Sequence, residues 1–333
     1  MSRNAPRIGL ALGGGGIAGY SFHAGALGAI EEATGWDPRT AEVIIGTSAG
    51  SSIASVLRGN VAVPELVERV LSVPTDPAGM SRLRDVAGRG QSLLGGWISP
   101  ASPALVAREV LRFHRIRPLN VLAGSLPVGK VDNEVLGEQA AVLHGLDWPS
   151  RETWIPAVAL DTGDVTVFGR DSVQTDLATA VAASCAIPAF FQPVTINGRR
   201  YIDGGVRSMM NVDLLAELDL DLVVALSPMS IDGLHLRSPF ASLARGLPKL
   251  QLRRELGVLH DVGIPTVCLE PDLSVSKAVG ANPMDPTRVV TILAASAVAV
   301  AAELTKTSHK PYLDLLREAG MLLESPENVP YPD

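Results

Sequence analysis

Short apolar runs rich in valine and isoleucine alternate with helix-like segments along most of the chain, and this rhythm limits the folds it can adopt. The runs that predict strands are residues 7–12, 42–45, 153–160, 165–168, 221–227 and 265–269. The segments that predict helices are residues 19–33, 51–58, 175–184, 213–218 and 240–262. Such alternation favours an α/β fold in which helices flank a mostly parallel central sheet. Because no linker divides the 333 residues, we expect a single α/β domain over residues 1–333.

Residues 61–150 break this rhythm, because they contain helix-like segments and almost no strand signal. Two interpretations fit: an ordinary helical layer, or a helical cap-like insertion within the domain that covers a pocket. Residues 92–105 are apolar and rich in glycine and proline, and Trp97 among them is the best candidate for contact with a lipid surface. A cap with an apolar rim would suit a fatty substrate.

The overall composition argues against some classes of partner. Hydrophobic residues make up 47% of the chain, enough for a large core, and the formal net charge is -7. We expect no nucleic-acid partner, which would require a basic stripe, and no strong attraction to anionic membranes. Cys185 and Cys268 lie in apolar runs, so they predict buried thiols and not a disulfide framework.

Two apolar segments resemble export or membrane signals. The run that follows Arg3 and Arg7 is short, ends in glycines and has no convincing cleavage site, so we expect a first strand and not a signal peptide. Residues 289–302 fall short of the about 20 apolar residues that a bilayer requires. We expect a buried, alanine-rich helix there, and a cytoplasmic protein.

Four glycines, Gly13 to Gly16, follow the first predicted strand and precede a helix. A glycine loop there can turn tightly and direct several backbone N–H groups at one negative charge. One interpretation is a dinucleotide site, since Gly14, Gly16 and Gly19 fit G-x-G-x-x-G, but no acid ends the second strand and no Lys follows the glycines. The other is an oxyanion hole built from N–H groups near Gly15 and Gly16.

Ser48 stands between two glycines in Gly46-Thr47-Ser48-Ala49-Gly50, where a buried strand becomes a helix. A serine on such a tight turn can present its hydroxyl at the sheet edge as a nucleophile, and the N–H of Ala49 can donate to the oxyanion. The alternative is a serine that only caps the helix, which is common. The glycine run nearby favours the nucleophile.

A serine nucleophile needs a base, and an aspartate has a better setting than any histidine. Asp203 precedes two glycines in "YIDGG", although an Asp-Gly turn explains that pattern equally well. Asp161 is the runner-up acid, and His235 is the least implausible histidine. No motif surrounds any of the six histidines, which are His23, His114, His144, His235, His260 and His309.

Taken together, "GGGGIAG", "GTSAG", "AASCAIPAFFQPV" and "YIDGG" resemble the patatin-like phospholipases over residues 7–211. The resemblance implies a three-layer architecture related to the α/β-hydrolases and a Ser–Asp dyad without a catalytic histidine. It makes Ser48 the nucleophile, Asp203 the base, and Gly14, Gly15 and Gly16 the oxyanion loop, with Ala49 as a further donor. It implies no cofactor and no metal. One departure is Ala18, which stands where the family pattern has Arg or Lys.

The predicted function is therefore a serine acyl hydrolase that cleaves fatty acyl esters of lipids through an acyl-serine intermediate. Its expected partner is an acyl lipid or other ester, with possible peripheral contact with a membrane. Two alternatives stay open. The same dyad could transfer the acyl group to an acceptor other than water, or the glycine loop could serve a non-catalytic module that binds an anion or a nucleotide.

Overall fold

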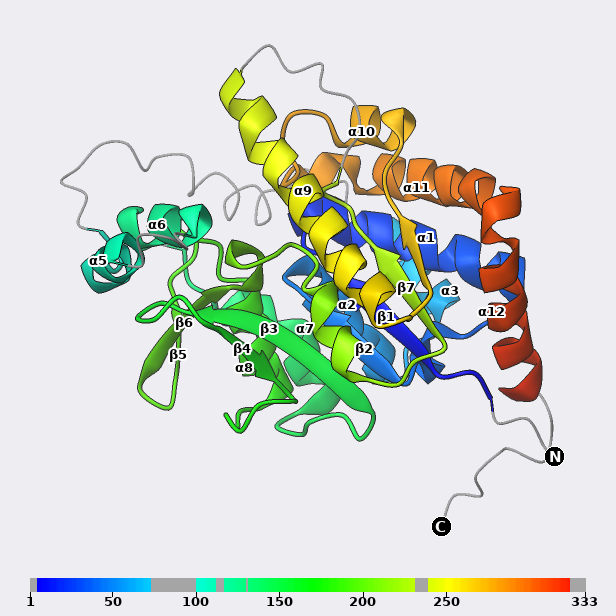
Figure 1. Cartoon of the computed structure of the whole chain (residues 1–333), viewed down its shortest axis with the longest axis horizontal. Coiled ribbons are helices and arrows are strands. Elements are labelled where there is room, and N and C mark those ends of the chain that lie inside the picture. The colour runs from blue at the N-terminus through cyan, green and yellow to red at the C-terminus, as the bar shows by residue number, and fades with distance from the viewer. Residues whose placement is uncertain (1–4, 73–99, 112–116, 130, 231–238, 324–333) are drawn as a thin grey trace.

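A mixed β-sheet runs through the centre of the computed structural model, which describes residues 5–72, 100–111, 117–129, 131–230 and 239–323 (Figure 1). Within these residues the sheet order is β5-β6-β3-β2-β1-β7-β8, with β4 paired to β3. The strands are β1 (Ile8–Leu12), β2 (Val43–Gly46), β3 (Glu152–Ala159), β4 (Val165–Phe168), β5 (Val194–Ile196), β6 (Arg199–Asp203), β7 (Leu222–Leu226) and β8 (Thr266–Leu269). Strands β3, β2, β1, β7 and β8 are parallel neighbours, so the predicted α/β fold with a mostly parallel sheet is confirmed.

The edge of the sheet beyond β3 is antiparallel and includes two strands that the sequence patterns did not predict. Strand β6 pairs with both β3 and β5 in antiparallel register. Asn197 and Gly198, which join β5 to β6, both have positive φ, at 50° and 79°. This is the geometry that lets an Asn-Gly pair close a tight hairpin whose twist matches its strands. The hairpin matters because β6 ends at Asp203.

Most helices share a core with one face of the sheet. They are α1 (Gly16–Thr34), α2 (Ala49–Arg58), α3 (Val63–Leu71), α7 (Glu134–His144), α8 (Leu177–Ser184), α10 (Leu273–Val279), α11 (Val289–Leu304) and α12 (Lys310–Leu323). The opposite face is covered by α9 (Pro239–Asp261) and by the 3-10 helix η3 (Val212–Glu217), which lies where an α-helix was predicted over residues 213–218. Helices on both faces give the predicted three layers.

Helix α11 is apolar along its length but only one of its faces is buried. It packs so closely on α1 that a Cβ added to Gly25 would lie 2.4 Å from the Leu293 carbonyl oxygen. Val298 on the outer face is 72% exposed. With η4 (Pro286–Arg288) it forms the only segment of the described residues, 19 residues over Pro286–Leu304, that is long and apolar enough to cross a membrane. The prediction of a buried helix is therefore correct for one face only. The prediction that this segment is too short to cross a membrane is not, because η4 and α11 together are longer than residues 289–302.

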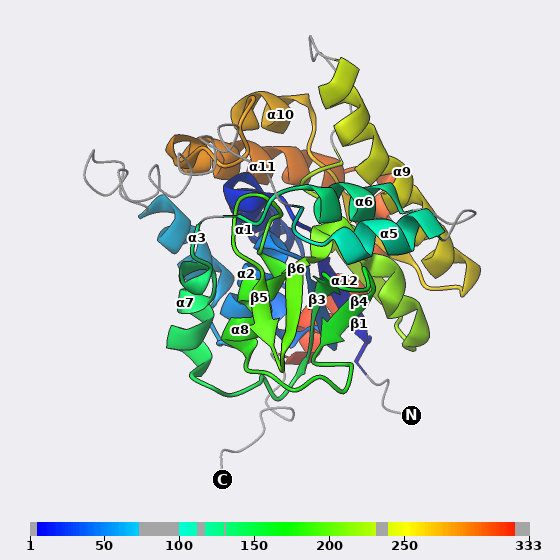
Figure 2. The same cartoon turned by 90° about the vertical axis from the view of Figure 1, so that its left-hand side faces the viewer.

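Helices α5 (Pro103–Leu111) and α6 (Pro118–Ser125) form a separate small unit against the ends of β3 and β6, which Figure 2 shows beside α9. The fully buried Glu109 accepts hydrogen bonds from Arg117 at 2.7 Å and from Asn120 at 3.1 Å. The Asn120 amide also donates to the Gly163 carbonyl over 3.0 Å, which ties the unit to the turn after β3. Within residues 61–150 the described elements are helices and isolated bridges, while Trp97 and His114 lie outside the described residues.

Candidate active site

The glycine loop after β1 is held in place by its own backbone. The Gly13 N–H donates to the Leu226 carbonyl of β7 over 3.0 Å, and the Gly14 N–H donates to the Met209 carbonyl over 2.8 Å. Below the loop, the fully buried His23 ring contacts the Gly13 carbonyl through Nε2 at 2.7 Å. Burial lowers the pKa of His23 to about 4, so a neutral ring donates this bond at neutral pH. The loop is thereby fixed next to the start of α1.

The Gly14 N–H is already used by Met209, which corrects its predicted part as an oxyanion donor. The N–H groups of Gly15, Gly16 and Ala49 have no acceptor among the described residues, because they precede or begin α1 and α2. Gly15 and Gly16 line a cavity that Ser48 also lines, and Ala49 lines a second one. Two helix N-termini therefore place unpaired donors and positive partial charge around one serine.

Ser48 occupies a strained turn between β2 and α2. Its φ of 51° and ψ of -119° are unusual for a residue with a side chain, and such conformations cost about 1–3 kcal/mol. The flanking glycines are required by close packing, since a Cβ on Gly50 would lie 2.0 Å from the Leu12 carbonyl oxygen and one on Gly46 2.5 Å from the Gly50 carbonyl oxygen. This is the geometry of a nucleophile elbow at the carboxyl edge of a sheet.

Ser184, at the end of α8, holds this turn to the neighbouring strand. Its hydroxyl accepts from the Ser48 N–H over 3.0 Å and donates to the Pro156 carbonyl of β3 over 2.7 Å. The side chain is fully buried. It lies in the segment "ASCAIPAFFQP" that the family resemblance singled out, although the serine itself was not predicted to have a role. The only feature of the sequence that could have pointed to Ser184 is its position in this motif.

Asp203 reaches Ser48 because β3 is longer than its partner β2. Strand β2 pairs with β3 only as far as Trp154, and the remainder of β3 pairs with the returning strand β6, with Ala157 opposite Asp203. The Asp203 N–H donates to the Ala186 carbonyl over 3.0 Å. A Cβ on the following Gly204 would lie 2.3 Å from the Pro156 carbonyl oxygen, so only glycine fits there. The antiparallel hairpin thus returns a carboxyl group to the end of β2.

The Asp203 carboxyl group is buried and lies beside the Ser48 hydroxyl. Burial raises the pKa of Asp203 from 3.8 to about 6, while hydrogen-bonding interactions with the Gly205 N–H and the Ser48 hydroxyl limit that rise. The Gly205 N–H donates to Oδ1 over 2.7 Å. Asp203 is 6% exposed and Ser48 5% exposed. A group with a pKa near 6 is ionised at neutral pH and can accept a proton from the serine.

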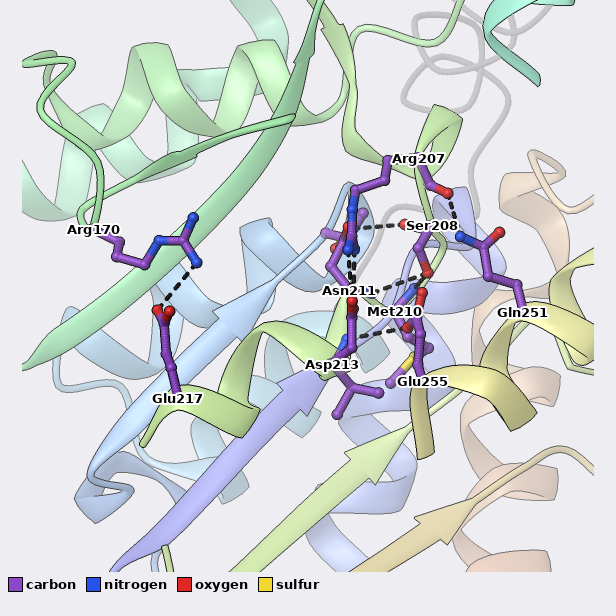
Figure 3. A network of polar contacts seen from close by, with 11 residues as sticks. Arg170, Arg207, Ser208, Met210, Asn211, Asp213, Glu217, Gln251 and Glu255 are labelled. Carbon is purple, nitrogen blue, oxygen red and sulfur yellow. Dashed lines mark hydrogen bonds and ion pairs between the residues drawn. The ribbon is translucent and has the colours of Figure 1, made fainter. Parts of the chain in front are cut away.

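A polar network joins the loop that follows β6 to α9 (Figure 3). Arg207 donates to Asn211 over 2.7 Å and pairs with Asp213 at 2.6 Å. The Val212 N–H donates to the buried Glu255 over 3.2 Å. Gln251, one turn before Glu255, donates to the Arg207 carbonyl. None of these roles was predicted, because a polar side chain between two distant segments leaves no periodic pattern in the sequence.

Two apolar cavities meet at Ser48. The first, of about 570 Å³, runs past Asp203 towards α6 and is lined there by Leu119, Leu122, Ala123 and Leu126. The second, of about 390 Å³, runs past Ala49 towards α3 and α7. Both volumes lie within the roughly 300–1,000 Å³ that is typical of sites for small organic ligands. Both cavities are lined by Ser48, Gly16, Ile187 and Met284, so the serine lies where the two cavities join.

The other candidate residues lie elsewhere. Asp161 is half exposed and pairs with Arg199 at 3.2 Å, and His235 lies outside the described residues. None of the described histidines lines either cavity. Ala18 is 4% exposed and packs in the apolar core, so a small apolar side chain stands where the family pattern has a cation.

The strained serine turn at the carboxyl edge of the α/β sheet, with a buried aspartate beside it, has the geometry of a nucleophile elbow with an acidic partner. The family model for patatin-like phospholipases matches residues 10–216, more than half of the chain. The chain therefore belongs to the patatin-like phospholipase family, as the four sequence motifs predicted.

The chain is also similar to individual proteins and to solved structures, at low sequence identity. Uncharacterized NTE family proteins of Mycobacterium bovis and Mycobacterium tuberculosis are 26% identical over 226 residues, 67% of this chain and 49% of each relative. The chain thus spans about half the length of these curated relatives. The crystal structure of the type III effector protein ExoU is 18% identical, covers 90% of this chain and 53% of its own, and has a TM-score of 0.36. VipD from Legionella pneumophila is 14% identical, with coverages of 90% and 67% and a TM-score of 0.40. Both scores lie below 0.5, so the family assignment rests on the sequence match.

Proposed function

We propose that the protein is a serine hydrolase that cleaves fatty acyl esters of lipids, with Ser48 as nucleophile and Asp203 as base. The observation that carries the proposal is the placing of one strained serine at the junction of two apolar cavities, beside a buried carboxyl group and below unpaired amide donors. Family membership supports the class of reaction.

The reaction follows from these positions. The Ser48 oxygen attacks the acyl carbonyl carbon while the Asp203 carboxylate takes the hydroxyl proton. The carbonyl oxygen becomes an oxyanion and accepts hydrogen bonds from the amides of Gly15, Gly16 and Ala49. Asp203 then gives its proton to the departing alcohol, which leaves an acyl-serine. Water attacks this ester, Asp203 takes the water proton, and the fatty acid is released as Ser48 recovers its proton.

The electrostatic setting suits a base that acts without histidine. An exposed aspartate with a pKa near 4 is a weak base, whereas burial brings Asp203 to about 6, nearer the pH at which it would act. The N-termini of α1 and α2 add positive partial charge where the oxyanion forms. Donors fixed in this way need no reorganisation during the reaction, and each is worth about 2.7–4 kcal/mol of barrier in known cases.

A fluorophosphonate probe and a chain-length series of p-nitrophenyl esters test the proposal directly. We expect covalent labelling of the wild type and faster hydrolysis of medium and long acyl chains than of acetate, because the first cavity is apolar. Ser48→Ala should abolish both. Ser308→Ala is the matched control, since Ser308 is an exposed serine that lines neither cavity. Wild type without esterase activity, or an active Ser48→Ala variant, overturns the proposal.

The second cavity gives the alternative of acyl transfer a physical basis, because an alcohol bound there would lie next to the acyl-serine. Such an acceptor would replace water in the second half of the reaction and yield a new ester instead of a free acid. Product analysis with and without added glycerol separates the two outcomes. Released fatty acid at every glycerol concentration identifies a hydrolase, and a glyceride that grows with glycerol identifies a transferase.

A further inference from the structure

The two cavities at Ser48 differ in the chemistry of their walls. Among the described residues of the first cavity, Asp203 beside the serine is the only ionisable side chain, and the far wall on α6 is entirely apolar. The second cavity carries Arg69, Tyr20, Gln139 and Ser52 along with its apolar residues. A substrate with one apolar and one polar end would therefore be oriented by the two cavities in a single direction.

The polar wall of the second cavity is built from three helices. Tyr20 lies on α1, Arg69 on α3 and Gln139 on α7. Both the oxygen and the nitrogen of the Gln139 amide lie 3.3 Å from the Tyr20 hydroxyl, a long contact that a ligand oxygen can replace. Burial raises the pKa of Tyr20, while the hydrogen bond with Gln139 and then the charge of Arg69 oppose that rise. Tyr20 and Arg69 line the same cavity. The three side chains offer several donors and one cation to a single ligand group.

The geometry points to a division of the substrate between the two cavities: the first takes the acyl chain, and the second takes the alcohol part with an anionic phosphate held by Arg69, Tyr20 and Gln139. This inference rests on the proposed function and adds to it the side chains that select a phosphorylated leaving group. Guanidinium donors match phosphate oxygens in charge and in geometry. The first cavity offers no cation among its described residues, so the reverse orientation has no such partner.

Arg69 is available for such a ligand although it is not unpaired. It pairs with Glu65 at 2.8 Å, one helical turn earlier on α3, and the two side chains are 39% and 53% exposed. Exposed pairs of this kind contribute little to stability, so a phosphate can take the place of Glu65 without a large loss. Glu65 does not line the cavity.

The test compares two substrates that differ only in the phosphate: monodecanoylglycerol and the lysophosphatidic acid with the same decanoyl chain. We expect the wild type to have the higher kcat/KM for the phosphorylated ester. Arg69→Met should lower the ratio of the two kcat/KM values by about tenfold or more, since a hydrogen bond to a charged group is lost. Arg69→Lys should recover part of the ratio, and Tyr20→Phe should lower it in the same direction.

Two control variants separate this effect from general attraction between protein and anion. Arg253→Met removes an exposed cation on α9 that lines neither cavity and should leave the ratio unchanged. Glu65→Gln removes the competing carboxylate and should leave the ratio equal or higher. Equal loss on both substrates in Arg69→Met, or no change in either Arg69→Met or Tyr20→Phe, overturns the inference while Ser48→Ala remains inactive. Activity retained by Ser48→Ala would instead overturn the proposed function itself.

Discussion

The Asn211 side chain donates a hydrogen bond from Nδ2 to the Thr47 hydroxyl over 3.0 Å, although the two residues are 164 positions apart in the sequence. Thr47 directly precedes Ser48, and Asn211 ends the loop that begins after Asp203. The same amide donates to the Ser208 carbonyl over 2.7 Å, and its oxygen accepts from Arg207. One buried amide thereby holds the serine turn and the aspartate loop in a fixed relation.

Loss of this link should impair the reaction more than the binding of substrate. Thr47→Val keeps the shape of the side chain but leaves a buried amide N–H without an acceptor, which costs about 1–3 kcal/mol of folding free energy. We expect kcat for a p-nitrophenyl ester to fall about 10- to 100-fold with little change in KM, because small misplacements of reacting groups are costly. Thr195→Val on β5 is the control, since Thr195 is exposed. Unchanged kcat in Thr47→Val would show that the link is not needed for alignment.

Asp203→Asn should exchange activity for stability. The pKa of the Asp203 carboxyl group is raised from 3.8 to about 6 in the folded protein. Binding of this proton therefore stabilises the fold fully below pH 3.8, and that stabilisation is lost as the pH rises through 6. Above pH 6 the buried charge costs about 3 kcal/mol, and a neutral amide avoids this cost. We expect an inactive variant that melts at a higher temperature than wild type at pH 8 and shows no such gain near pH 4. The wild-type kcat/KM should rise with pH through about 6, and a profile flat from pH 5 to pH 8 would argue against this base.

Glu255→Gln should remove a second pH dependence of stability without removing activity. Burial, followed by the nearby charge of Asp213, raises the pKa of Glu255 from 4.5 to about 7. The stabilising proton is therefore present below pH 4.5 and is lost as the pH rises through 7. Glutamine keeps an oxygen that can accept the Val212 N–H bond, whereas Glu255→Ala leaves that donor unpaired. Thermal melts from pH 4 to pH 9 should show the variant gaining on wild type with rising pH, and a parallel pair of curves would contradict this.

Gly50→Ala and Gly257→Ala should move stability in opposite directions. A methyl group at Gly50 would meet the Leu12 carbonyl oxygen at 2.0 Å, so the turn at Ser48 must distort, at a cost of about 3 kcal/mol or more. Gly257 lies in α9 with nothing within 4 Å of an added Cβ. Alanine there should add about 0.5–1 kcal/mol by reducing the entropy of the unfolded chain. Urea unfolding of both variants measures the two changes, and equal effects would contradict the packing described for the serine turn.

Ala18→Arg should restore the family pattern but destabilise this protein. Ala18 lines a small apolar niche together with Phe22, Pro228, Pro271 and Val275, and the described residues of this niche include no acidic side chain for a guanidinium group. Burial of an unpaired cation is strongly unfavourable. We expect a lower melting temperature and no gain in esterase activity. A more active and equally stable variant would mean that the loop can admit the cation after all.

The inner strands were predictable because both of their faces are buried, which gives long runs of branched apolar residues. Strand β1 and strand β7 are buried at every position. Strand β6, in contrast, begins with two exposed arginines before Tyr201, and its three apolar or acidic end residues are too few for a periodic signal. Only Asn197-Gly198 marks the hairpin locally.

The residues of the candidate site also divide into those that the sequence could locate and those that only the structure identifies. Ser48 and the glycines could be located because the constraints on them are local: a tight turn, a close backbone approach and a helix start. The pairing of Asp203 with Ser48 depends on β3 extending past β2, which no local pattern records. Ser184 and Asn211 are polar residues whose partners lie far away in the sequence, so only the folded structure identifies them.

The overhang of β3 beyond β2 has a consequence for assembly. The serine turn follows an inner parallel strand and the aspartate lies on an edge hairpin, so the two residues of the proposed dyad come from different parts of the fold. Bringing together Ser48 and Asp203, which lie far apart in the sequence, is slow compared with forming a hairpin or a helix. Recovery of esterase activity during refolding therefore reports the docking of the edge hairpin, and it should lag behind the return of helical circular dichroism.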